Sequence, residues 1–74
     1  MTEALETWTI YDRPLDYPDG YVARRFLIRH GAALATHIAY YGPTLDSVRE
    51  QIPQGLFCIA RNPGDEPQIV ETWL

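Results

Sequence analysis

The sequence has 74 residues, of which 46% are hydrophobic and 22% are charged, and its formal net charge at pH 7 is −4. A chain of this length buries only roughly 60% of the surface that it exposes when unfolded, which excludes two domains and leaves room for one small core. The composition is typical of a globular chain and excludes a disordered tail. We therefore expect residues 1–74 to form a single small globular domain, with residues 1–6 as a frayed N-terminus.

The first predicted element is a strand over residues 7–11, where β-branched and aromatic residues alternate. Arg13 and Pro14 end this strand. Residues 16–20 then carry the proline, aspartate and glycine that a turn requires.

Residues 21–29 form the longest strand-like run, and a period of two separates its side chains into two faces. We expect one face to lie on the core, with an arginine as its misfit: Val22, Arg24, Phe26 and Ile28. We expect the other face to be partly solvated: Tyr21, Ala23, Arg25, Leu27 and Arg29. A glycine-containing hairpin loop at 30–33 leads to a returning strand over 34–41, whose core side is favoured to be the one with Leu34 and Ile38.

A helix of about two turns is predicted after Gly42 and Pro43. Thr44 is a good N-cap residue, and the apolar residues Leu45, Val48 and Ile52 are spaced to form one face. A helix this short does not persist alone in water, so its apolar face must lie on the sheet.

Residues 56–60 are apolar on both faces, which predicts a central, well-covered strand that buries Cys58. A strong turn at 62–67, centred on Pro63 and Gly64, leads to a last strand over 69–74. The element order β-β-β-α-β-β predicts an α+β two-layer sandwich, with a mostly antiparallel five-stranded sheet and one short helix on one face.

The right-handedness of the crossover through the helix predicts that the fourth strand runs in the direction of the third. The last strand is then antiparallel to the first and able to pair with it. This arrangement brings Trp8 close to Trp73.

Few residues are suited to catalysis. Cys58 is the only cysteine, which excludes an intrachain disulfide and a cysteine-rich zinc site. His30 and His37 lack a partner serine, because Ser47 is explained by hydrogen bonds in the first turn of the helix. The aspartates of 12–19 are explained by turn formation. We therefore expect no enzymatic activity, no metal and no cofactor.

All six basic residues are arginines, and five of them lie in residues 21–61, between acidic ends. Either the ends fold back and neutralise the middle, or the middle forms a patch for an anionic partner. Arg24 either pairs with a carboxylate such as Asp12 or Glu71, or lies where the strand face is open.

The candidate binding residues are Tyr21, Arg25, Arg29 and Tyr41. The first three share one face of their strand, and the neighbouring strand supplies Tyr40 or Tyr41 to it according to the register. Arginine forks bind phosphate or carboxylate, and aromatic rings on a sheet can stack on unpaired bases. The competing interpretation is that Tyr21 and the arginine stems only cover an open face, with Asp and Glu as their partners.

Two stretches carry a resemblance to known sequences. The start, Trp-Thr-Ile-Tyr-Asp-Arg-Pro-Leu-Asp-Tyr-Pro at 8–18, and the end, Asp-Glu-Pro-Gln-Ile-Val-Glu-Thr-Trp at 65–73, resemble a group of short uncharacterised bacterial and phage proteins. Members of that group often have histidine where Arg13 stands, so chemistry attributed to that histidine does not transfer to this chain. The resemblance implies a self-standing domain and implies no activity.

The sequence thus predicts a small binding or interaction module that acts through the arginine and tyrosine face or through an exposed strand edge. An alternative is a structural subunit that functions by homo-oligomeric assembly, because small domains often gain stability in this way. A third interpretation is a weak binder of single-stranded nucleic acid, which the negative net charge disfavours. The expected partner is a protein, with a homodimer as one form.

The expected location is the cytoplasm, without a membrane partner. No apolar run approaches the roughly 18 residues that a membrane span needs. The first six residues are acidic, unlike the start of a signal peptide.

Overall fold

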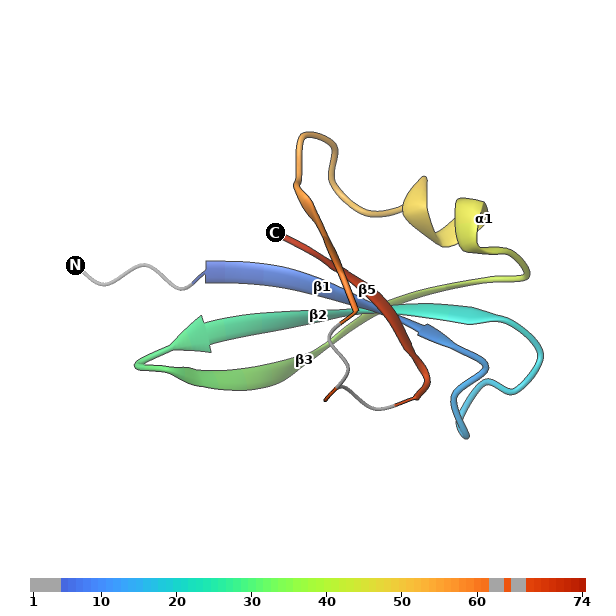
Figure 1. Ribbon diagram of the computed structural model, residues 1–74, viewed down its shortest axis with the longest axis horizontal. Helices are drawn as coiled ribbons and strands as arrows, with labels where there is room; N and C mark the ends of the chain where they lie inside the picture. Colours follow the sequence, from blue (N-terminus) through green and yellow to red (C-terminus); the bar gives the residue numbers. More distant parts are fainter. Residues whose placement is uncertain (1–4, 62–63, 65–66) are drawn as a thin grey trace.

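A computed structural model describes residues 5–61, 64 and 67–74 and shows an antiparallel sheet with one short helix against it (Figure 1). The strands are β1 (Leu5–Asp12), β2 (Tyr21–Arg29), β3 (Ala32–Gly42), β4 (Cys58–Ala60) and β5 (Ile69–Trp73), and the helix is α1 (Leu45–Arg49). The sheet has five strands in the order β3-β2-β1-β5-β4. The predicted α+β fold and its element order are confirmed. No helix in these ranges has the length and apolar character that crossing a membrane requires.

The first and last strands meet in the interior of the sheet. β1 pairs antiparallel with β5, and Trp8 lies directly opposite Trp73, as predicted. β5 in turn pairs antiparallel with β4, so β4 runs in the same direction as β3 across the helix. Pairing of β5 with both β1 and β4 leaves β4 at one border of the sheet and β3 at the other.

The β2–β3 hairpin turns through two residues with left-handed backbone. His30 has φ of 49° and Gly31 has φ of 78°, as a type I′ turn requires. The loop is shorter than predicted, since β3 already begins at Ala32. The pairing of β2 with β3 is irregular between Arg24 and Phe26, where the Thr36 hydroxyl donates to the Arg25 carbonyl at 3.0 Å.

The helix begins where the sequence predicts. The Thr44 side chain accepts a hydrogen bond from the Ser47 amide at 3.2 Å, and the Ser47 hydroxyl accepts one from the Thr44 amide at 3.2 Å, which forms a capping box. Val48 and Ile52 are buried against the sheet. Gly42 lets Ser47 approach the strand, because a Cβ at Gly42 would lie 2.0 Å from the Ser47 hydroxyl oxygen.

The helix lies on the opposite face of β2 from the one predicted. The core consists of Trp8, Ile10, Ala23, Val48 and Ile52, so the Tyr21, Ala23 and Arg25 face is the helix face. The small Ala23 leaves room for the Trp8 and Tyr40 rings, which stack with centroids 5.2 Å apart. The core is thus filled by larger side chains from the strands on either side of Ala23. The alternation pattern of β2 alone does not reveal this.

The other face of β2 is covered at one end by the segment 13–20. Val22 is fully buried there, and the Tyr17 ring packs edge-on against the Tyr41 ring, with the two ring centroids 5.1 Å apart. Arg24 forms an ion pair with Asp16, rather than with Asp12 or Glu71 as anticipated. Both faces of β2 are therefore buried near Val22, and period-two alternation is a poor guide at this position.

Two further predictions change in the structure, and a third is not tested by it. Residues 56–60 do not form a central strand, because β5 takes the interior position and β4 is an edge strand whose three residues are all exposed. Leu5 and Glu6 belong to β1 and are not frayed, while residues 1–4 lie outside the described part of the chain. The predicted turn at 62–67 also lies largely outside it.

The core position of Ile10 predicts a large loss of stability on truncation. Ile10→Ala removes a fully buried side chain and leaves a cavity, so the free energy of unfolding should fall by about 3 kcal/mol. Urea denaturation followed by tryptophan fluorescence measures this change. Leu15→Ala is the matched control, because Leu15 is 97% exposed, and its effect should stay below about 0.5 kcal/mol. Equal losses in the two variants would contradict this assignment of the core.

Candidate functional site

The four predicted binding residues do not come together. Tyr21, Arg25 and Arg29 share the helix face of β2, but Tyr41 lies opposite Val22 on the other face. Tyr21 packs against the core, and Arg29 lies at the exposed end of its strand. The predicted arginine and tyrosine face is therefore divided between two surfaces.

Arg25 is held by a carboxylate of the N-terminal strand. Its Nε lies 2.6 Å from Oε2 of Glu6, and Oε1 of Glu6 accepts a hydrogen bond from the Trp8 indole at 2.9 Å. The Arg25 hydrogen bond lowers the pKa of Glu6, and the Trp8 hydrogen bond adds to this effect. Arg25 is thus engaged within the molecule.

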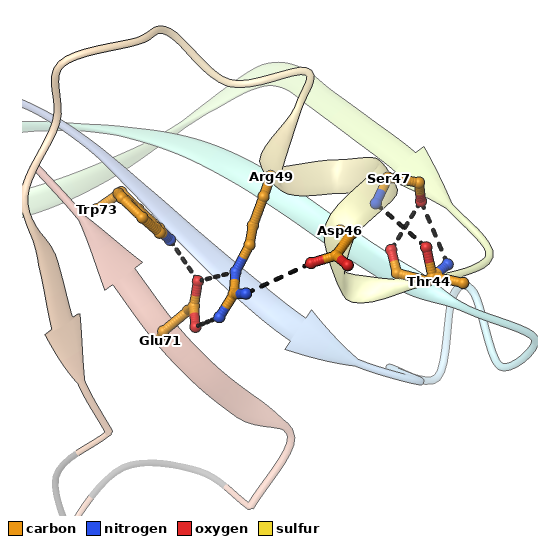
Figure 2. A network of polar contacts seen from close by, with 6 residues as sticks. All are labelled: Thr44, Asp46, Ser47, Arg49, Glu71 and Trp73. Atoms are coloured by element: carbon orange, nitrogen blue, oxygen red, sulfur yellow. Dashed lines mark hydrogen bonds and ion pairs between the residues drawn. The ribbon is translucent and has the colours of Figure 1, made fainter.

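A second group of the same composition joins the helix to β5 (Figure 2). Arg49 donates from Nε and Nη2 to the two carboxylate oxygens of Glu71 at 2.8 and 2.6 Å, and the Trp73 indole donates to the same carboxylate. The Glu71 side chain is only 7% exposed. The hydrogen bonds from Arg49 lower the pKa of Glu71 although burial opposes this, so the carboxylate is ionised at neutral pH.

The two groups have a common sequence signal. The tripeptide Glu-Thr-Trp occurs at 6–8 and again at 71–73. In each copy the indole and the carboxylate point to the same strand face, since residues two apart do so, and an arginine from another element completes the group. The repeated tripeptide was the signal that our sequence analysis missed.

Intramolecular pairing accounts for four of the arginines in the described ranges. Besides Arg25 and Arg49, Arg13 pairs with Asp12 and Arg24 pairs with Asp16. Three of the four pairs join an arginine of the basic middle to a carboxylate of an acidic end. The structure therefore favours charge neutralisation within the chain over a patch for an anionic partner.

A cleft of about 340 Å³ lies beside the second group. It is lined by α1, the segment after it and the last strand: Asp46, Arg49, Glu50, Ile52, Pro53, Gln54, Gly55, Leu56 and Trp73. Arg49 contributes the basic group of this lining, but its guanidinium is already engaged by Glu71 and lies 3.5 Å from Asp46. Among the described residues that line it, the cleft consequently offers no unpaired cation to an anionic ligand.

The outer border of β4 is the more distinctive surface. Phe57 and Leu74 exchange both backbone hydrogen bonds, at 2.7 and 2.9 Å. In an antiparallel pair such bonds alternate along the strand, so the N–H and C=O groups of Cys58 and Ala60 point away from β5. Phe57 is 80% exposed and Ile59 is 46% exposed, and both share the sheet face opposite the helix.

Cys58 is exposed on this border rather than buried as predicted. Its thiol faces the helix side of the sheet, where β4 places it near Glu71. Desolvation of the sulfur raises the pKa of the Cys58 thiol, and the Glu71 charge acts in the same direction. A thiol with a raised pKa is a poor nucleophile at neutral pH, and we assign it no catalytic role.

His30 lies apart from the aspartates considered for chemistry. His30 is in the β2–β3 turn, whereas the segment containing Asp16 and Asp19 joins β1 to β2 at the opposite end of the sheet (Figure 1). Ser47 caps the helix, as predicted. Across residues 5–61, 64 and 67–74, no three His, Cys, Asp or Glu side chains gather as a metal site would require.

Comparisons with protein-family models, with curated proteins and with solved structures yield no match to this chain. The resemblance to short bacterial and phage proteins therefore stays a prediction.

The buried carboxylate of Glu71 predicts a pH-dependent role for Arg49. Arg49→Met leaves Glu71 without its bidentate partner, and because Arg49 is partly exposed we expect a loss of about 2 kcal/mol at pH 7. In the folded protein the pKa of Glu71 lies below its usual value of 4.5. The ion pair therefore contributes its full stabilisation above pH 4.5, and this contribution is lost as the pH falls through the pKa of Glu71 in the folded protein.

The measurement is urea denaturation of the parent protein and the Arg49→Met variant from pH 7 to pH 3. The difference in free energy of unfolding between the two should shrink as the pH falls below 4.5. Arg29→Met is the matched control, because Arg29 is exposed, and it should differ little from the parent at any pH. A difference for Arg49→Met that is constant over this range would refute the proposed contribution of Glu71.

Proposed function

We propose that this protein is a non-enzymatic interaction module of the cytoplasm, which binds an extended segment of a protein partner along the outer border of β4. The binding mode is strand addition, in which a partner segment becomes the next strand of the sheet. The partner supplies backbone groups for affinity and side chains for selectivity.

The observation that carries this proposal is the composition of the β4 border. Two residues, Cys58 and Ala60, present backbone donors and acceptors outward, as the pairing with β5 requires. Phe57 and Ile59 are exposed beside them, and residues 57–60 carry no charged side chain. An edge strand without charge or proline is open to pairing with another chain.

The opposite border of the sheet is less suited to strand addition. The Gln51 side chain donates to the Tyr41 carbonyl at 2.9 Å, at the end of β3 nearest the helix. The irregular pairing near Thr36 and Ile38 interrupts the middle of the same strand. Bulges and covering groups are devices that protect edges, and β4 shows neither in the described residues.

Nucleic-acid binding is a weaker alternative. Arg24, Arg25 and Arg49 are all paired with carboxylates, and the net charge of −4 repels a phosphate backbone. An arginine-rich surface of the predicted kind is therefore largely neutralised.

The test is selection of extended peptides from a displayed random library, followed by measurement of their binding to variants. Ala60→Pro removes an outward N–H, leaves the bonds between β4 and β5 intact, and should weaken binding at least tenfold. In the parent protein, selected peptides should shift the amide NMR signals of Cys58 and Ala60.

Leu15→Ala is the matched control. Leu15 is exposed and far from β4 along the chain, so this variant should bind the peptides like the parent. Peptides that bind Ala60→Pro as tightly as the parent would contradict the proposal, as would signals that shift only around the cleft or on β2.

A further inference from the structure

We infer that the segment added at β4 is β4 of a second copy of this chain, so that two sheets join about a two-fold axis through Ile59. This inference rests on the proposed function and names its partner. Homodimers of this kind are isologous, which means that the same residues meet from both sides.

The backbone selects the position of the axis. In antiparallel pairing, residues with outward backbone groups must face one another, which restricts the partners of Cys58 and Ala60 to the same two residues of the second copy. An axis through Ile59 pairs Cys58 with Ala60 of the second copy and Ala60 with Cys58 of the second copy. It therefore engages every outward group of β4, whereas an axis through Cys58 or Ala60 leaves part of them unpaired.

The side chains fit the same register. The two Ile59 residues become direct neighbours in a non-hydrogen-bonded pair, the kind in which side chains approach most closely. Phe57, which is 80% exposed, lies beside them on the same face and faces residue 61 of the second copy. Position 61 thus lies opposite Phe57 rather than opposite a second Arg61, so no like charges oppose one another.

The strand is accordingly self-complementary, which is the reason to favour a second copy over an unrelated peptide. Pairing joins two five-stranded sheets into one continuous sheet and removes the β4 border from solvent. Because β4 has only three residues, the interface is small and the dimer exchanges with monomer as concentration changes.

The test is disulfide cross-linking at single positions. In a Cys58→Ala background, Ile59→Cys places the two introduced thiols directly opposite each other, within the Cα separation that a disulfide accepts. Ala60→Cys in the same background faces residue 58 and not its own copy. Leu15→Cys, at an exposed position away from the sheet border, reports random collision.

Under mild oxidation, the C58A/I59C variant should form covalent dimer at least tenfold faster than C58A/L15C, and C58A/A60C should stay near the Leu15 level. Sedimentation of the protein without substitutions should show a dimer that dissociates on dilution, and Ala60→Pro should be monomeric. Cross-linking at 59 no faster than at 15, or equal cross-linking at 59 and 60, overturns the inference. A protein that is monomeric at every concentration also overturns it.

The two proposals fail separately. Peptide binding at β4 without cross-linking at position 59 removes the dimer and leaves strand addition intact. If neither peptide binding nor cross-linking is observed, both strand addition at β4 and the dimer are ruled out. Circular dichroism of each variant confirms that the sheet is retained, and the sedimentation experiment needs no substitution.

Discussion

The ion pair between Arg49 and Glu71 is the interaction on which the arrangement of the C-terminal half depends. A five-residue helix has too few internal hydrogen bonds to persist alone, so it needs contacts with the sheet. Val48 and Ile52 supply apolar contacts, and Arg49 adds a directed bond to a carboxylate that is itself buried. Removal of either partner leaves the other poorly satisfied, which makes the pair costly to break. It thereby fixes the position of β5 relative to α1 and shapes the cleft between them.

The same chemistry occurs on both sides of the pairing between β1 and β5. Glu6 and Glu71 each hold an indole of their own strand and an arginine of another element, and the two indoles belong to directly paired residues. Each group ties its strand to a neighbouring element, Glu6 to β2 and Glu71 to α1, while the backbone pairing of β1 with β5 places β5 in the interior of the sheet. Because β5 takes that place, β4 is displaced to the border with its backbone groups outward. The exposed edge is thus a consequence of how the chain ends meet.

Elements whose causes are local were predictable from the sequence. Thr44 caps the helix by contacting a residue three positions away, and Gly31 supplies the positive φ of a turn that spans two residues. The pairing of Trp8 with Trp73 followed from the handedness of crossovers. The covered face of β2 was not predictable, because Ala23 is buried by rings from other strands. The exposure of residues 56–60 was not predictable either. It depends on the position of β5 in the sheet, which no local sequence pattern encodes.

The pairing of Trp8 with Trp73 has a consequence for the time course of folding. The β2–β3 hairpin and the helix join residues that are close along the chain, whereas closing β1 on β5 brings together positions at opposite ends of it. The entropy of closing a loop is lost before the contacts within it are gained, and topologies rich in such long-range pairs fold slowly for their size. We therefore expect the hairpin to form early and the two tryptophans to meet in the rate-limiting step. Until they do, the border of β1 that later receives β5 is itself an open edge, to which another strand can pair.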